Sequence, residues 1–217
     1  MARYKKGVNT CSYIISVSKK LFYKKGYSQT TIQQICDECN ITLGNFTYYF
    51  KTKQDLLKRI YEDFLKEIIV FIDNNFKDDL SYLEKFTIIS FVFNYKILQS
   101  ETNLDFHIKV LNNNSLYEFI SDYLLSNFYI PLIKSLNLDI NEKDLKIIYY
   151  CSLSINRELL IKYIKTDMFN SHQDFCLNLS NIVSTLFKFD DNFIVKFIDK
   201  YPEFSPKLQA IDLSLLK

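Results

Sequence analysis

The chain has 217 residues, of which 48% are hydrophobic and 24% are charged, a balance typical of a globular protein with a substantial core. Its three glycines all lie within the first 44 residues, so the rest of the chain cannot form a glycine-rich phosphate loop. The net charge of +2 hides an asymmetry: residues 1–60 hold 11 Lys and Arg against 3 Asp and Glu, whereas residues 61–217 hold 16 against 22. A basic N-terminal part suits a phosphate backbone, although such patches have other uses.

The first predicted helix covers about residues 9–25. Apolar residues recur along it at helical spacing, and Lys24 and Lys25 in the last turn complement the helix dipole. Gly26 follows directly and is expected to end the helix, because glycine adopts the left-handed conformation without steric penalty.

The next stretch, residues 30–57, predicts a helix, a tight turn, a second short helix and the start of a third. Thr30 or Thr31 can cap the first of these helices through its hydroxyl. Asn40 tolerates the left-handed conformation that stops a helix, and Thr42 can cap the short helix after the turn. A helix packed on a helix across such a turn is how a recognition helix is presented to a DNA major groove.

Further helices are predicted at residues 52–75, 80–99, 103–111, 115–136, 141–165, 171–189 and 192–200. Pro131 is expected to kink the helix at 115–136 or to end it early. A period of 3.6 residues describes the long segments better than a period of 2, so the sequence predicts an all-α fold. We expect a helix-turn-helix DNA-binding domain over residues 1–52 and a larger helical domain over residues 53–217.

A connected set of residues between about positions 9 and 60 follows a recognisable order and spacing. Its members are Ile14, Ile15, Ser18, Leu21, Phe22, Gly26, Tyr27, Thr30, Thr31, Ile32, Ile35, Cys36, Ile41, Thr42, Gly44, Tyr49, Phe50, Lys53, Asp55, Leu56 and Leu57. This set resembles the N-terminal domain of the TetR family of bacterial transcriptional repressors. The resemblance covers roughly a quarter of the chain.

Five positions depart from the family pattern. The family usually has Ala where this chain has Ser18, Cys36 and Cys39, which are also small, and Gly where it has Asn40. At Thr47 the family usually has Tyr, often a DNA contact, so a hydroxyl is kept but its reach is shorter.

The resemblance implies a set of DNA-contacting residues. Those expected to face the bases are Leu43, Asn45, Thr47 and Tyr48, and those expected to hold phosphates are Thr31, Thr42, Tyr49 and Lys53. Thr30 and Lys51 complete the predicted DNA-binding surface. Asn45 is the best candidate for reading a base, because its amide can pair bidentately with adenine. For Tyr49 the alternative is core packing beside Phe50.

The resemblance also implies a homodimer that binds a palindromic operator in double-stranded DNA and acts as a repressor. The dimer would form through helices 141–165 and 171–189, which are apolar over a wide arc, although deep burial within a monomer would give the same pattern. Two recognition helices must lie about 34–36 Å apart to enter successive major grooves. A small effector that moved the helix at 52–75 would change this separation and release the DNA.

Aromatic residues interleaved with polar ones predict a pocket for an apolar or aromatic effector. The candidate lining residues are Phe64, Phe93, Asn94, Phe106, His107, Phe119, Tyr123 and Asn156. Each of them can equally be ordinary core, and His107 in particular can be a core histidine with its hydrogen bonds satisfied.

Other kinds of site find little support. Cys36 and Cys39 form a single CxxC pair, and His107 and His172 are distant in sequence, so we expect packing rather than a metal site, and no cofactor. No Ser-His-Asp or HExxH pattern is present, so we expect no enzymatic activity. The main alternative function is a helical module that has lost DNA recognition and binds a protein or lipid, and Thr47 is its best support.

The expected location is the cytoplasm. No stretch reaches the roughly 18 apolar residues of a membrane span, and the apolar stretch near the basic N-terminus is too short for a signal peptide. The five cysteines are odd in number and irregularly spaced, which favours a reducing compartment over a disulfide framework. We therefore expect no contact with a membrane.

Overall fold

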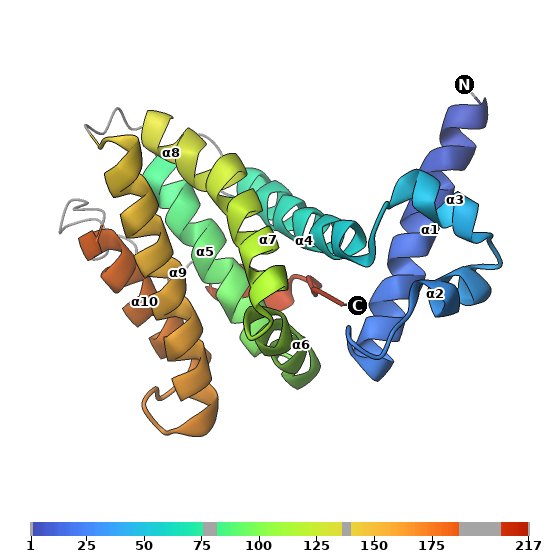
Figure 1. Ribbon diagram of the computed structural model, residues 1–217. Helices are drawn as coiled ribbons and strands as arrows, with labels where there is room; N and C mark the ends of the chain where they lie inside the picture. The colour runs from blue at the N-terminus through green and yellow to red at the C-terminus, as the bar shows by residue number, and fades with distance from the viewer. Residues whose placement is uncertain (1, 76–81, 136–139, 187–204, 217) are drawn as a thin grey trace.

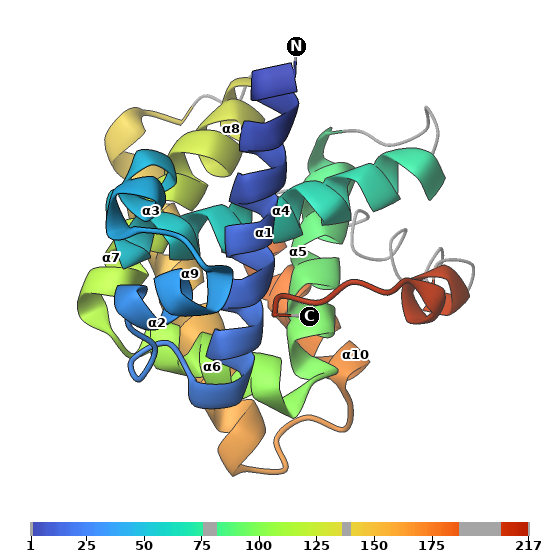
Figure 2. The ribbon, with the colours of Figure 1, turned by 90° about the vertical axis from the view of Figure 1, so that its right-hand side faces the viewer.

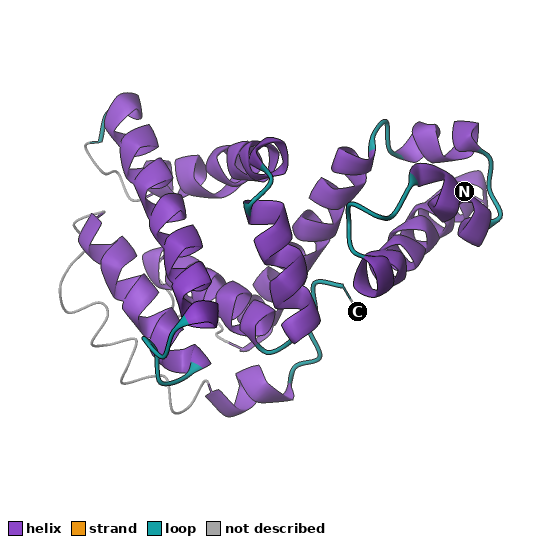
Figure 3. Ribbon diagram, turned by 60° about the horizontal axis from the view of Figure 1, so that its bottom comes forward, coloured by secondary structure: helices purple, strands orange, loops and turns teal. Residues whose placement is uncertain are grey.

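The computed structural model describes residues 2–75, 82–135, 140–186 and 205–216, and these residues form helices and loops without any strand (Figure 3). The all-α prediction is confirmed. The helices are α1 (Ala2–Lys25), α2 (Ile32–Cys39), α3 (Leu43–Tyr49), α4 (Lys53–Asn75), α5 (Tyr82–Leu98), α6 (Glu101–Leu111), α7 (Asn114–Leu124), α8 (Ile130–Ser135), α9 (Glu142–Lys165) and α10 (His172–Leu186). No described helix is long and apolar enough to cross a membrane.

Helices α1–α3 form one end of the molecule, which we call the head, and α5–α10 form the larger bundle, which we call the body (Figure 1). Helix α4 starts in the head and runs into the body. One cluster of buried apolar side chains follows it without a break, from Ile14 and Phe46 in the head to Phe91 and Phe175 in the body. Head and body are therefore packed on a shared helix rather than joined by a loose linker.

Local hydrogen bonds explain where the short helices of the head begin. Thr31 Oγ1 accepts from the Gln34 backbone N–H at 3.1 Å, and Gln34 Oε1 accepts from the Thr31 N–H at 3.0 Å, which makes a reciprocal capping box at the start of α2. Thr42 Oγ1 accepts from the Asn45 N–H at 3.2 Å and caps α3. Thr31 and Thr42 are thus the two caps, both within the set predicted from the sequence.

Left-handed residues end the helices that precede these caps. Gly26 stops α1 with φ +79°, and Asn40 stops α2 with φ 52° and ψ 48°. The N–H of Ile41 then donates to the Cys36 carbonyl at 3.0 Å, so the last turn of α2 is closed. Asn40 can hold this conformation because its short polar side chain makes the left-handed region accessible.

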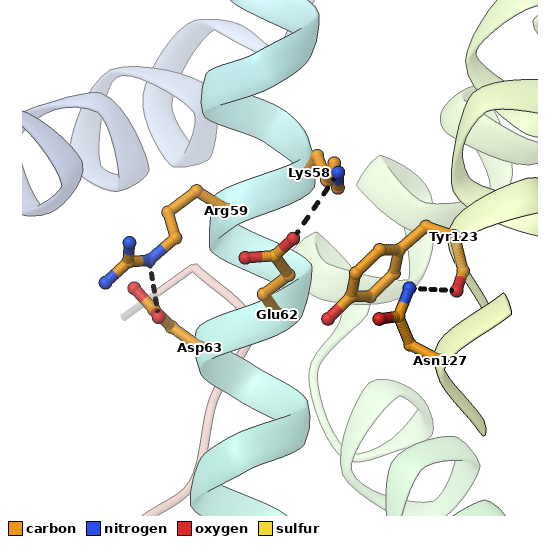
Figure 4. Close-up of polar contacts among 6 residues, drawn as sticks. All are labelled: Lys58, Arg59, Glu62, Asp63, Tyr123 and Asn127. Carbon is orange, nitrogen blue, oxygen red and sulfur yellow. Dashed lines mark hydrogen bonds and ion pairs between the residues drawn. The ribbon is translucent and has the colours of Figure 1, made fainter. Parts of the chain in front are cut away.

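Helix α7 lies against the first half of α4 (Figure 4). The ammonium of Lys58 is 3.7 Å from Glu62 on its own helix and 5.0 Å from the centre of the Tyr123 ring on α7. On another side of α4, Arg59 pairs with Asp63 at 2.7 Å. The contact between α4 and α7 thus combines an aromatic surface with a cation, an arrangement that favours a fixed orientation of the two helices.

A C-terminal segment that sequence patterns did not reveal ties the two ends of the molecule together. Residues 205–210 are helical, and residues 211–216 run extended across α5 and end beside α1 (Figure 2). Leu215 and Leu216 are buried. Three side chains hold the backbone and Ser214 of this segment: Lys96 donates to the Ile211 carbonyl at 2.8 Å, Asn103 to Ser214 Oγ at 2.9 Å, and Lys19 to the Ser214 carbonyl at 3.3 Å.

The first helix differs most from its predicted boundary, since α1 begins at Ala2 rather than near residue 9. Of the two outcomes expected at Pro131, a kink or an early end of the helix, the early end is wrong. The chain passes from α7 through a π-helical turn at Leu125–Tyr129 directly into α8. The irregular turn lies immediately before the proline, where the ring would otherwise clash with a carbonyl of a regular helix. The helix predicted at residues 192–200 lies outside the described residues.

Candidate DNA-binding surface and ligand cavity

The outward face of α3 is exposed. Tyr48 is 81% exposed and Leu43 is 53% exposed, while Phe46, on the side of the helix opposite Tyr48, is fully buried. The Phe46 ring lies 5.8 Å from that of Phe50, another buried residue, so these two aromatic side chains anchor the short helix to the head. Because side chains two positions apart on a helix point in different directions, this anchoring turns Tyr48 toward solvent, while Leu43 is exposed at the first position of the helix.

The polar side chains on this face differ in which hydrogen-bonding groups they leave free for a partner. Asn45 is exposed, and its amide group has no partner within the described part of the chain. Thr47 is also exposed, but its hydroxyl donates to the Gly44 carbonyl at 3.1 Å. Thr47 therefore has only acceptor capacity left, whereas Asn45 presents both a donor and an acceptor. Tyr49 is half-buried against the core and meets Tyr48 edge-to-face at 5.0 Å.

The structure places Thr30 and Lys53 inside the turn between α1 and α2 rather than on the open surface. Thr30 is fully buried, and its hydroxyl donates to the Gly26 carbonyl at 2.8 Å. The Lys53 ammonium donates to the carbonyls of Tyr27 at 2.9 Å and Thr30 at 2.7 Å, and it lies 4.2 Å from the centre of the Tyr27 ring. Burial lowers the pKa of Lys53. Its two carbonyl partners show that Lys53 fixes this turn.

Lys51 provides a contrast within the same loop. It is exposed, and none of the ion pairs among the described residues includes it. Thr31 and Thr42 are exposed as well, each at the N-terminus of a helix. Free N–H groups at helix N-termini and an unpaired lysine are groups that bind phosphate. The surface around α3 thus combines a protruding face with potential phosphate contacts on its rim.

A cavity of about 100 Å³ lies within the body. Its walls come from α4, α5, α7, α9 and α10, and Leu65 is the contribution of α4. The polar lining residues are Thr87, Ser90, Asn94, Ser152, Asn156 and Ser180. Of the eight pocket residues predicted from the sequence, Phe93, Asn94 and Asn156 line this cavity.

The other five predicted pocket residues lie elsewhere. His107 is buried and its Nδ1 is 2.8 Å from the Tyr61 hydroxyl, so the two form a hydrogen-bonded pair. Burial lowers the pKa of His107 to about 4. Phe106 stacks on Phe22 of the head at 5.8 Å, and Phe64 packs on Phe93 at 5.4 Å. Phe119 and Tyr123 are the two aromatic residues that face Lys58 between α7 and α4.

The serines and the threonine of the cavity were missed in the sequence, although for Ser90 and Ser152 a signal exists in their spacing from the predicted Asn94 and Asn156. Ser90 and Asn94 are four positions apart on α5, and Ser152 and Asn156 are four positions apart on α9. Residues at this spacing share one face of a helix. A polar pair at this spacing in an otherwise apolar helix can therefore mark the wall of a cavity.

One face of α9 carries exposed apolar side chains. Ile147 and Ile164 are about half exposed, Tyr150 is 43% exposed, and Met168 just beyond the helix is 57% exposed. Cys151 is exposed as well. Cys36 and Cys39, in contrast, are buried in the core of the head, and burial raises the pKa of Cys39 to about 11. Their position in the core agrees with the packing interpretation of this pair.

Comparison with known proteins relates the N-terminal part of the chain to a family. Residues 14–60 match the family model described as bacterial regulatory proteins, tetR family. The HTH-type transcriptional regulator YerO of Bacillus subtilis (strain 168), itself uncharacterized, is 52% identical over 44 residues, which are 20% of this chain and 15% of that protein. The chain thus spans about 15% of the length of the curated relative.

Solved structures extend the likeness to most of the chain. A crystal structure from Syntrophomonas wolfei, assigned to TetR-family transcriptional regulators, has a TM-score of 0.59 at 24% identity and covers 83% of this chain and 95% of that one. The structure of RolR in complex with the ligand resorcinol has a TM-score of 0.59 at 13% identity and covers 88% and 94%. At these identities the likeness shows the fold. The N-terminal part of the chain, residues 14–60, thus matches the tetR family of bacterial regulatory proteins, and the chain as a whole shares the fold of solved structures from that family.

Proposed function

We propose that the chain is a transcriptional regulator that binds a palindromic operator in double-stranded DNA as a homodimer. The observation that supports this best is the exposed face of α3, where Leu43, Asn45 and Tyr48 project from a helix anchored by the buried Phe46. An exposed face with an unpartnered amide is what base reading in a major groove requires. The excess of basic residues in the first 60 positions supplies the attraction for phosphates.

Within this proposal the DNA-binding residues have distinct roles. Asn45 reads a base edge, and Leu43, Tyr48 and Thr47 make further contacts in the groove. The exposed Thr31, Thr42 and Lys51 and the half-buried Tyr49 lie around the rim and hold phosphates. Lys53 and Thr30 act indirectly, because they fix the turn that precedes α2. The DNA-binding domain comprises residues 1–52, and the domain for ligand binding and dimerisation comprises residues 53–217.

The proposed dimer interface is formed by α9 and α10. The exposed apolar residues of α9, such as Ile147 and Ile164, would be removed from water by a second copy of the same face. Replacing both with Lys should shift the chain from dimer to monomer in sedimentation velocity. Val70 on α4 is similarly exposed, at 57%, so Val70→Lys is a matched control that should leave the dimer intact.

The proposed switch is a small, mostly apolar effector in the cavity of the body, and its binding releases DNA. Leu65 brings α4 into the cavity wall, and α4 is also the helix on which the head packs. An effector with higher affinity for one position of α4 would therefore shift the heads. The RolR complex with resorcinol, a small aromatic molecule, supports this use of the fold.

A mobility-shift titration with the DNA upstream of the chain's own coding region tests the proposal. Binding should weaken steeply as salt rises, because phosphate contacts release counterions. Asn45→Ala should relax preference at one base pair by about 1–3 kcal/mol, while Asn114→Ala, at an exposed asparagine at the start of α7, should have no effect. Equal loss on every DNA sequence for Asn45→Ala would contradict base reading.

Absence of any shift, at low salt and across fragments, would overturn the regulator proposal itself. The helical module for a protein or lipid would then be the better explanation. One observation favours that alternative. The family usually has Tyr at the position of Thr47, and the Thr47 hydroxyl donates its hydrogen to the Gly44 carbonyl of its own helix rather than toward solvent.

A further inference from the structure

The walls of the cavity carry no charge. The described residues that line it are Leu, Ile, Val, Phe, Cys, Ser, Thr and Asn side chains, with no Lys, Arg, His, Asp or Glu among them. An ion placed there would lose its hydration without gaining a counter-charge, which is strongly unfavourable. The occupant of this cavity must therefore be electrically neutral.

Two buried acceptors in the wall have no donor. Asn94 is only 3% exposed, and its Nδ2 donates to the Ser90 carbonyl at 2.9 Å while its Oδ1 has no partner. Asn156, on the facing helix α9, also has a buried Oδ1 without a partner. A buried acceptor left unpaired is unfavourable until a donor reaches it. An occupant with an O–H or N–H group would supply that donor.

The size of the cavity limits the occupant. In another protein, an apolar cavity of about 150 Å³ accommodates benzene. The present cavity, at about 100 Å³, is of the same order and has room for one six-membered ring or for about three water molecules. Its apolar lining, which includes Leu65 and Phe93, suits a ring or a short hydrocarbon chain.

We infer that the cavity selects small, neutral, apolar molecules that carry a hydrogen-bond donor, of the class of phenols and alcohols, and that the buried amide oxygen of Asn94 receives the donor. This inference rests on the proposed effector role of the cavity and narrows it to one chemical class. Carboxylates, acyl phosphates and ammonium compounds are excluded by the uncharged wall, and hydrocarbons without a donor bind more weakly.

The test is an NMR titration of the full chain, without DNA, using three probes of similar shape: phenol, toluene and benzoate. Phenol should shift the amide signals of Asn94, Ser152 and their neighbours and saturate, whereas signals of α3 should stay in place. Toluene should bind about fivefold more weakly, the loss expected for one hydrogen bond, and benzoate should leave the cavity signals unchanged. Benzoate or toluene binding as tightly as phenol would overturn the inference, as would failure of all three probes.

Two variants test whether Asn94 accepts the hydrogen bond from the phenol hydroxyl. Asn94→Leu should reduce the affinity for phenol to that for toluene. Asn127 makes the same type of hydrogen bond as Asn94, from its Nδ2 to the carbonyl four residues earlier, at 2.9 Å, but on an exposed surface (Figure 4). Asn127→Leu is therefore the matched control and should bind phenol like the unmodified chain. If both variants lose phenol equally, or neither does, the assignment to Asn94 is overturned.

The three-probe comparison on the unmodified chain decides the inference even if Asn94→Leu does not fold. The result of the probe titration can also be distinguished from the result of the mobility-shift test of the proposed function. If the mobility-shift assay shows no DNA binding but the three probes bind in the expected order, only the proposed regulator function is refuted. If the chain binds DNA but the affinities of the three probes follow another order, only the inferred ligand class is refuted.

Discussion

Lys53 shows how a residue predicted from a family pattern can have a different immediate role in the folded chain. The resemblance assigns it to phosphate contact, but its ammonium already donates to the carbonyls of Tyr27 and Thr30. Those carbonyls belong to the turn between α1 and α2, where no helix satisfies them. A cation that caps two carbonyls holds the turn in one conformation. Lys53 thereby positions the start of α2.

Replacing Lys53 with Met should separate the two roles. Loss of two hydrogen bonds from a charged donor should lower the free energy of unfolding by about 1–3 kcal/mol, measured by urea titration. Lys51→Met, at an exposed position, should change stability by less than about 0.5 kcal/mol and should reduce the salt dependence of DNA binding by about one phosphate contact. A Lys53→Met chain as stable as the unmodified one would show that the turn does not need the ammonium.

His107 should make stability depend on pH in a defined window. Burial lowers its pKa from 6.5 to about 4. Above about pH 6.5 the imidazole is neutral in both states and has no effect on stability. Between about pH 6.5 and 4 the unfolded chain binds a proton that the folded chain does not, so the free energy of unfolding falls as the pH falls. The full effect is on the order of 3 kcal/mol.

Urea unfolding at pH 7.5, 6.0 and 5.0 measures this dependence, with His107→Gln as the comparison. The variant should lose most of the decline between pH 6.5 and 5, because Gln does not titrate. If the free energy of unfolding of the variant declines as much as that of the unmodified chain, other titrating groups cause the decline. The first of these to examine is the half-buried His172, through His172→Gln.

At the scale of elements, the helix boundaries of the head follow from local chemistry and were therefore visible in the sequence. Thr31 and Thr42 cap their helices, and Asn40 ends α2, because these side chains act on neighbouring backbone groups. The π-helical turn before Pro131 was not visible, because proline is compatible with a kink, a helix end or a shifted register, and the packing of neighbouring helices decides among them.

Asn40 offers a test of the helix-turn-helix geometry. At φ 52° and ψ 48° a β-branched side chain clashes with the backbone, so Asn40→Val should lower the free energy of unfolding by about 1–2 kcal/mol. Asn40→Gly should be tolerated within about 0.5 kcal/mol, since glycine adopts this conformation freely. Urea titration of both variants provides the measurement. Equal stability of the Val and Gly variants would mean that α2 ends in another conformation in solution.

At the scale of the whole molecule, contacts between residues distant in sequence determine what local patterns cannot. Phe106 and His107 were candidate pocket residues, yet one packs on the head and the other pairs with Tyr61. An aromatic residue on an apolar helix face signals burial without saying against what it is buried. The cavity itself is recognisable only when five helices are brought together, although its serines and asparagines do follow helical spacing.

The C-terminal segment is the largest feature that periodicity could not reveal, because residues 211–216 form no regular element. Leu215 is fully buried, so Leu215→Ala should lower the free energy of unfolding by about 2–5 kcal/mol. Leu213, which is partly exposed, is the matched control, and Leu213→Ala should have a clearly smaller effect. Equal effects of the two substitutions, measured by urea titration, would mean that the segment is not docked in solution.

The same segment has a consequence for folding during synthesis on the ribosome. The hydrogen bond between Lys19 and the Ser214 carbonyl joins positions 195 residues apart. The N-terminal helices can form early during translation, but this contact must wait until residue 214 has been synthesised. Final docking of the nascent N-terminal part therefore comes late, after the emerging chain has had time to fold helix by helix.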